Sequence, residues 1–254
     1  MAPVSDRAAL RAILKQDPRW NLYALGDLAP GYFERCQWRA SGSAVLLLYR
    51  AVTPPVLFAT GEPDAVAPLL DRIDEQAVYL HVRPRIADLI APRCATIDVR
   101  PMWRMALEPS AFRPESGAAP AERLGAADAG AIERLYADGA ATGESPDFFF
   151  APMVEAGVFY GVREQGELIA VAGTHLAEPS EGVAAIGNVY TRRDRRGRGL
   201  AGALTSAVTC ELLRLGVETV GLNVIQKNTA AVRVYERLGF ERYCDFVEGV
   251  AAFT

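Results

Sequence analysis

The sequence offers little from which a metal centre or a disulfide framework could be built. Its 254 residues include four cysteines and two histidines. The cysteines are far apart and form no C-x-x-C pair: Cys36, Cys94, Cys210 and Cys244. Zinc sites and disulfide-stapled folds depend on closely spaced ligands or on many cysteines in a short chain. We therefore predict no metal site, and four thiols that are buried or idle.

Long apolar runs and an excess of basic charge are also absent. No stretch approaches the roughly 20 apolar residues that span a bilayer, and the first residues, MAPVSDR, contain no apolar signal region. The net charge is −4 and the sequence pI is about 5.4, so the chain as a whole does not attract polyanions. These absences predict a cytoplasmic protein that binds neither membranes nor nucleic acid.

One change in composition suggests where the chain divides. Residues 108–120, EPSAFRPESGAAP, are rich in Pro, Ser, Gly and Ala, and such a segment is typical of a linker. We therefore expect an N-terminal domain over 1–108, a linker over 109–120 and a C-terminal domain over 121–254. Each domain is long enough to bury a core.

The hydrophobic pattern of the N-terminal part predicts a mixed α/β domain. Helices are expected at 6–15, 64–73 and 84–90, strands at 44–49, 56–59 and 77–82, and a final strand or hairpin at 97–107. This part contains no glycine loop and no cluster of acid and base residues. Its sequence alone does not predict what it does.

The C-terminal part has a clearer order of elements. Helices are expected at 127–137, 145–156, 200–215 and 228–238, and strands at 157–162, 168–175, 183–191, 219–225 and 240–252. The helix over 200–215 has the most regular apolar stripe. Asn228 is a candidate N-cap of the last helix, and Gly239 is its candidate left-handed stop.

The segment IGNVYTRRDRRGRGLAGA, residues 186–203, is the most informative. It reads as a strand, an arginine-rich loop and a long helix. A glycine loop that leads into a helix presents unpaired N–H groups and the positive end of the helix dipole, which together bind phosphate. Gly197 and Gly199 permit positive φ and a close approach of the backbone. The loop also carries five arginines, which favour a polyphosphate: Arg192, Arg193, Arg195, Arg196 and Arg198.

Two other phosphate-binding motifs fit this segment poorly. GRGLAG satisfies the dinucleotide pattern G-x-G-x-x-G, but five residues separate it from the strand. The acidic ribose ligand of that motif is also missing, since Glu218 precedes the next strand and Asn223 lies inside it. No Lys-Ser/Thr pair follows the glycines, which argues against a P-loop.

The segment resembles the signature Q/R-x-x-G-x-G/A of the GNAT superfamily of N-acetyltransferases. The matching residues are Arg196, Gly197, Arg198, Gly199, Leu200 and Ala201. A second element of that family, a strand with Asn followed by a helix with Tyr and a closing Gly-Phe, matches LNV and QKNTAAVRVYERLGF. It supplies Asn223, Asn228, Tyr235, Gly239 and Phe240. The resemblance covers residues 120–254, just over half of the chain.

The resemblance implies an α/β fold with a C-terminal GNAT domain, in which flanking helices cover a mixed, mostly antiparallel sheet. WNLYALGDL at 20–28 and IGNVYT before the loop are similar to the glycine N-acyltransferase-like subgroup. That subgroup joins a half without a phosphate loop to a catalytic C-terminal half. The N-terminal domain is therefore expected to be a degenerate GNAT copy.

The family also implies roles for individual residues. Backbone N–H groups from Arg196 to Ala201 would hold the pyrophosphate of coenzyme A. The strand end at Val189, Tyr190 and Thr191 would splay from the 219–225 strand and pair with pantetheine, while the Val189 amide would stabilise the thioester oxyanion. Asn223 and Asn228 would contact the cofactor, and Tyr235 would protonate the departing thiolate. Two other interpretations remain open, since Asn228 also suits a helix cap and Tyr235 also suits the core.

The chain departs from the family in one respect that matters for catalysis. Many members carry a Glu in the strand before the loop as general base, but residues 184–186 are Ala-Ala-Ile. The candidate replacements are His175, Glu144, Glu155 or a water molecule held by Asn188. His175 and Asn188 are taken as candidate substrate-site residues, and the base is left open.

We therefore expect direct transfer of an acetyl or related acyl group from acetyl-coenzyme A to an amine of a small molecule or amino acid. A homodimer is compatible with this interpretation. One alternative is an acyl-coenzyme A sensor without activity, which the missing carboxylate favours. The other is an interaction protein whose arginine loop binds nucleic acid.

Overall fold

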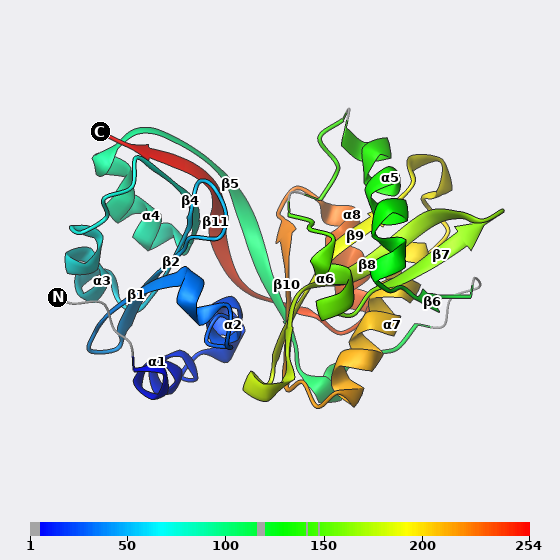
Figure 1. Ribbon diagram of the computed structural model, residues 1–254, viewed down its shortest axis with the longest axis horizontal. Coiled ribbons are helices and arrows are strands. Elements are labelled where there is room, and N and C mark those ends of the chain that lie inside the picture. Colours follow the sequence, from blue (N-terminus) through cyan, green and yellow to red (C-terminus); the bar gives the residue numbers. More distant parts are fainter. Residues whose placement is uncertain (1–5, 116–119, 141, 147) are drawn as a thin grey trace. The chain divides into compact units, whose positions relative to one another are not determined.

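The computed structural model of the protein describes residues 6–115, 120–140, 142–146 and 148–254. Contacts divide the chain into two compact units (Figure 1). The first unit contains Met1–Arg104, Val224–Lys227 and Arg242–Thr254, and the second contains Met105–Asn223 and Asn228–Glu241. Among the described residues, every helix is too short or too polar to cross a lipid bilayer.

The first unit is a sheet with the strand order β1-β2-β3-β4-β11-β5. Strands β1, β2 and β3 are antiparallel, and β3 is parallel to β4. A buried apolar cluster joins α3 and α4 to the sheet through residues such as Val66, Leu69 and Ile86. The elements of this unit are α1 (Arg7–Leu14), α2 (Pro18–Gly26), β1 (Cys36–Ser41), β2 (Ala44–Tyr49), β3 (Val56–Thr60), α3 (Pro63–Leu70), β4 (Ala77–Val82), α4 (Pro84–Ile90), β5 (Cys94–Leu107) and β11 (Glu241–Phe253).

The last strand does not fold with the C-terminal part, where the sequence interpretation placed residues 242–254. Strand β11 pairs antiparallel with β4, from Val247 opposite Val82 to Ala252 opposite Ala77. The partner of β11 lies far away in the sequence. A local hydrophobic pattern cannot reveal such a distant strand pairing. The remaining boundaries, including the linker over 109–120, stay predictions, and residues 116–119 of that segment lie outside the described residues.

The second unit has the strand order β10-β9-β8-β7-β6. Pairs β6–β7, β7–β8 and β8–β9 are antiparallel, and β9–β10 is parallel. This confirms the expected α/β class with a mixed, mostly antiparallel sheet and flanking helices (Figure 1). The elements are β6 (Glu122–Arg123), α5 (Ala129–Ala140), α6 (Pro152–Ala156), β7 (Tyr160–Glu164), β8 (Glu167–Glu178), β9 (Val183–Thr191), α7 (Leu200–Arg214), β10 (Thr219–Ile225) and α8 (Thr229–Arg237).

Helices lie on both faces of this second sheet. Val171 and Tyr190 pack against α5 and α6 in one buried cluster. Helix α7 packs against β8 and β9, on the opposite face, because successive side chains of a strand point to opposite sides. The buried Ala170 and Ala172 flank Val171 on β8 and face that helix. Their small side chains let α7 approach the sheet closely.

One predicted helix is largely wrong. The sequence interpretation expected a helix over 145–156, whereas the structure has only α6, Pro152–Ala156. Pro152 stands at the first turn of α6, where its missing N–H costs nothing. The Ser145 hydroxyl donates a hydrogen bond to the Tyr136 carbonyl of α5 instead of capping a new helix, and residues 145, 146 and 148–151 are not helical. Residue 147 lies outside the described residues.

Candidate functional site

Strands β9 and β10 separate partway along their length. Their parallel ladder runs from Val183 opposite Thr219 to Ile186 opposite Leu222. Strand β9 continues to Thr191, where it still pairs with β8. The described pairing therefore leaves the β10-facing edge of residues 187–191 without a strand partner, as the sequence interpretation predicted for this strand end. Val189, Tyr190 and Thr191 all lie on this segment.

A β-bulge marks the point of separation. Register shifts between the pairs Val171–Tyr190 and Gly173–Gly187, so β9 carries an additional residue. Asn188 has φ 55° and is 3% exposed, a left-handed conformation that asparagine tolerates better than most residues. The Tyr136 hydroxyl donates a hydrogen bond to the Asn188 carbonyl at 2.8 Å. Bulges of this kind redirect side chains and often lie beside active sites.

The glycine loop before α7 has the geometry that an anion requires. Gly197 and Gly199 have φ 78° and 73°, confirming the predicted positive φ. A Cβ added at either glycine would meet nothing within 4 Å. Gly199 is the N-cap of α7, and no side chain caps that end. The N–H groups of the first turn, including those of Leu200 and Ala201, are therefore available to a ligand.

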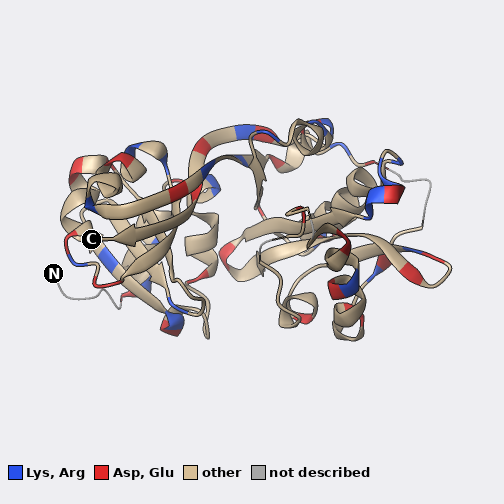
Figure 2. Ribbon diagram, turned by 90° about the horizontal axis from the view of Figure 1, so that it is seen from above, with Lys and Arg blue, Asp and Glu red and all other residues tan. Residues whose placement is uncertain are grey.

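The arginines of the loop are not free cations, which corrects the simple picture of a basic run. Arg196 makes two hydrogen bonds to the Glu144 carboxylate, at 2.9 and 3.3 Å, and Arg198 lies 2.5 Å from Glu164. The other ion pairs are Arg192 with Glu167 and Asp194, Arg193 with Asp138, and Arg195 with Glu164 and Asp194. In the second unit acidic and basic segments accordingly interleave (Figure 2).

Asp138, at the end of α5, is a site residue that the sequence interpretation missed. Its Oδ2 accepts hydrogen bonds from the Arg193 backbone N–H at 3.0 Å and from the Tyr190 hydroxyl at 2.8 Å. These donors hold the pKa of Asp138 below its usual value. Asp138 thereby connects α5 to the end of β9 and to the start of the loop. No motif in the sequence distinguishes it from other surface acids.

Helix α8 positions the second group of predicted residues. Asn228 Oδ1 accepts a hydrogen bond from the Ala231 N–H at 3.1 Å, so Asn228 caps the helix. Gly239 has φ 99° and stops the helix, as predicted.

Tyr235 is 8% exposed and lies edge-on to Phe240, with ring centroids 6.2 Å apart. Burial raises the pKa of Tyr235 to about 12, so the phenol keeps its proton at neutral pH. Asn223, half-buried on β10, is the first residue after the last β9–β10 pair.

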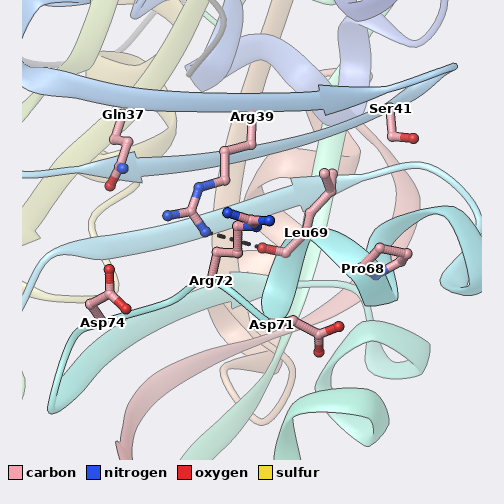
Figure 3. A pocket seen from close by; sticks show the side chains of 8 residues that line it. All are labelled: Gln37, Arg39, Ser41, Pro68, Leu69, Asp71, Arg72 and Asp74. Carbon is pink, nitrogen blue, oxygen red and sulfur yellow. Dashed lines mark hydrogen bonds between the residues drawn. The ribbon is translucent and has the colours of Figure 1, made fainter. Parts of the chain in front are cut away.

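A surface pocket in the first unit is lined in part by a helix-capping arginine. In the first unit a pocket of about 800 Å³ is lined by residues from β1 and from the end of α3, including Asp71 and Asp74 (Figure 3). Arg39, only 7% exposed, donates a hydrogen bond to the Leu69 carbonyl at 3.2 Å. A cation at a helix C-terminus satisfies its free carbonyls and dipole. We therefore interpret Arg39 as a cap of α3.

Comparison with known proteins agrees with the geometry of the second unit. Residues 130–240 match the profile of the Acetyltransferase (GNAT) family. A mycothiol acetyltransferase from Thermobispora bispora is 38% identical over 96 residues, which are 36% of this chain and 32% of the relative. The match thus spans about a third of the length of that relative. A mycothiol acetyltransferase from Sanguibacter keddieii is 27% identical over 268 residues, covering 95% of this chain and 85% of the relative.

A solved structure extends the likeness to most of the chain. It is a putative acetyltransferase of the GNAT family from Novosphingobium aromaticivorans, with a TM-score of 0.61 and 26% identity. The match covers 90% of this chain and 96% of that protein. Residues 130–240 are therefore similar to a GNAT acetyltransferase domain, and acetyltransferases of this family use acetyl-coenzyme A as the acyl donor.

Proposed function

We propose that the GNAT domain transfers an acetyl or related acyl group directly from acyl-coenzyme A to the amine of a small molecule. One observation carries the proposal: the β9–β10 ladder ends at Ile186–Leu222, beside an uncapped helix that a glycine loop introduces. The strand edge offers N–H and C=O groups to an extended, amide-containing arm. The helix end offers N–H groups to phosphate.

The residues of the loop fit a pyrophosphate. Because positions 197 and 199 carry no side chain, the space in front of their backbone is open to a ligand. Both positions have positive φ. Backbone N–H groups from Arg196 to Ala201 would hold the phosphate oxygens. The ion pairs of Arg196 and Arg198 are exposed, and exposed pairs contribute only about 0–1 kcal/mol each. A phosphate can therefore replace the carboxylate partners at little cost.

Three groups would carry out the chemistry on the bound thioester. The amine nitrogen attacks the carbonyl carbon, and the Val189 N–H on the free edge of β9 stabilises the negative charge that develops on oxygen. The C–S bond then breaks, and the Tyr235 phenol donates its proton to the sulfur. Asn223 and Asn228 would contact the cofactor from β10 and from the start of α8. Since Asn228 Oδ1 caps the helix, only its Nδ2 would serve as a donor.

The first unit is proposed to be a copy of the same fold without a cofactor site. It too has a parallel pair, β3–β4, whose ladder ends at Phe58 opposite His81. There the Trp20 indole N–H donates to the Ala59 carbonyl at 3.3 Å, and Trp20 is 1% exposed. Trp20 thus fills the position that a cofactor arm would need. Helix α3 begins with Glu62 as N-cap and Pro63 at its first turn, which repel phosphate and remove an N–H donor.

The test is an acetyl-transfer assay with a panel of amines. Purified full-length protein is incubated with acetyl-coenzyme A and each amine, thiol release is followed with a thiol reagent, and the acetylated product is identified by mass spectrometry. Because the relatives are named mycothiol acetyltransferases, an acetylation related to mycothiol is the first activity to test. The Gly199→Glu variant, described below, is the matched negative control.

The assay also separates the alternatives. Acetylation of at least one amine supports the proposal. If acetyl-coenzyme A binds tightly but no amine is acetylated, the protein is an acyl-coenzyme A sensor. If acetyl-coenzyme A does not bind at all, the loop before α7 is not a coenzyme A site and the proposal is wrong.

A further inference from the structure

We propose that His175 and Asn188 form the acceptor-amine site, with His175 as the general base that removes a proton from the ammonium group. This inference rests on the acyl transfer proposed above. It fills the role for which residues 184–186 of β9 offer no carboxylate. It also gives a role to the two β-bulges, one on β8 and one on β9, that lie beside these residues.

His175 is the additional residue of a bulge on β8. The register shifts between Thr174–Ile186 and Leu176–Ala185, so His175 has no residue directly opposite it on β9. Its imidazole lies over the Gly187 backbone instead: a Cβ added at Gly187 would be 2.4 Å from His175 Nε2 and 2.5 Å from Cδ2 and Cε1. The missing side chain of Gly187 is what lets the ring occupy this position.

Gly187 places the imidazole at the opening between the strands. It is the first residue of β9 after Ile186, the last one paired with β10. Gly187 pairs with Gly173 on β8, where an added Cβ would clash with the Phe159 ring. Paired residues share one face of a sheet, so the imidazole lies on the face that α5 and α6 cover.

Asn188, next along β9, supplies a hydrogen-bond acceptor. Its Nδ2 lies 3.4 Å from the Thr174 carbonyl, which turns the amide towards β8. The buried Oδ1 has no hydrogen-bond partner among the described residues, although an unsatisfied buried acceptor costs about 1–3 kcal/mol. An N–H group of an ammonium ion, or a water molecule that carries its proton, would satisfy this oxygen.

The other candidate bases are less suitable. Glu144 is held by Arg196, whose hydrogen bonds, together with that of Thr142, keep the pKa of Glu144 below its usual value. It is therefore a poor proton acceptor. Glu155 is exposed on the short helix α6. The second histidine, His81, belongs to the other unit, where it contacts Glu248 and Arg104.

The proton balance of the reaction is complete with these groups. The substrate enters as R–NH3⁺ and gives one proton to the neutral imidazole of His175, which passes it to solvent. The amine attacks, the C–N bond forms and the C–S bond breaks. The nitrogen loses its second proton to solvent, Tyr235 protonates the sulfur, and Tyr235 is reprotonated from solvent. The net products are the amide, the free thiol and one proton.

The test compares His175→Gln with wild type on two classes of amine. With an alkylamine, which is charged at neutral pH, kcat should fall about 10²-fold or more, the range of a lost general base. With hydroxylamine or an O-alkylhydroxylamine such as methoxyamine, whose nitrogen is mostly uncharged at neutral pH, the fall should be at least tenfold smaller. The dissociation constant for acetyl-coenzyme A should stay within about twofold, since the imidazole acts on the acceptor.

Two further variants distinguish catalysis from structure. Gly187→Ala keeps the imidazole but displaces it, because the added Cβ would lie 2.4 Å from Nε2, so it should show the same dependence on the class of amine. Free imidazole should restore part of the activity of His175→Ala. Equal losses for both classes of amine, or an unchanged kcat, would overturn the assignment of the base. If wild type itself acetylates no amine, the proposed function has failed instead.

Discussion

Removal of the Tyr235 hydroxyl tests the proposed acid role and so distinguishes an enzyme from a binding protein. Tyr235→Phe keeps the ring, which is 8% exposed and packs edge-on to Phe240. Burial raises the pKa of Tyr235 to about 12, so the group that is removed is a protonated phenol. If that phenol protonates the departing thiolate, kcat should fall by about 10²–10⁴-fold.

The expected effects on binding and stability are small. Loss of an interaction made only in the transition state lowers kcat while leaving the affinity for acetyl-coenzyme A unchanged. The substitution keeps the aromatic ring and its edge-on contact with Phe240 and removes only the hydroxyl. The free energy of unfolding should therefore change by less than about 1 kcal/mol.

Three measurements on this variant decide the role of Tyr235. They are kcat with a saturating amine, the dissociation constant for acetyl-coenzyme A by calorimetry, and the midpoint of urea unfolding. Wild type provides the reference in each case. An unchanged kcat with a true substrate would refute the acid role, and a large loss of stability would instead assign Tyr235 to the core.

Three further predictions follow from the loop, the first unit and the Asp27 carboxyl. Gly199→Glu places a carboxylate where the phosphates should lie and imposes a φ of 73° on a residue with a side chain, so calorimetry should show loss of acetyl-coenzyme A binding while the fold is retained. If the first unit is the proposed copy without a cofactor site, with Trp20, which is bonded to the Ala59 carbonyl, in place of a cofactor arm, wild type should bind one acetyl-coenzyme A per chain, and a stoichiometry of two would contradict that role. Burial raises the pKa of Asp27 to about 7, against about 3.9 in an unfolded chain, so the folded state binds this proton more tightly and loses stability as the pH rises from about 4 through 7. Asp27→Asn should therefore raise the melting temperature more at pH 8 than at pH 5, and an equal gain at both values would show that Asp27 titrates normally.

Local signals in the sequence were sufficient to predict the conformation of the glycine loop before α7. Strand β9, the glycines with positive φ and the Asn228 cap all agree with the prediction, because each depends on a few adjacent residues. Helix α2 was missed for the opposite reason. Six of its nine residues are buried, so it shows no apolar stripe with a polar face from which a helical period could be read.

Features that depend on distant residues could not be predicted. The pairing of Asp138 with Tyr190 and the Arg193 backbone joins segments more than 50 residues apart, and a single acid at the end of a helix carries no signal of that partnership. The bulge that places His175 over Gly187 likewise depends on how β8 and β9 align. Alignment between strands is decided by packing across the sheet rather than by the composition of either strand.

The charge of the loop shows how the site would select its ligand. The five arginines from Arg192 to Arg198 pair with five carboxylates: Asp138, Glu144, Glu164, Glu167 and Asp194. The local charge is therefore close to zero, and the loop has no strong field that would draw any polyanion from solution. Nucleic-acid binding depends on uncompensated basic charge, and these ion pairs leave little of it in the loop. Selection then depends on the N–H groups of the glycine loop and of α7, whose fixed directions suit a compact pyrophosphate, with the arginines exchanging their carboxylate partners for phosphate once it is bound.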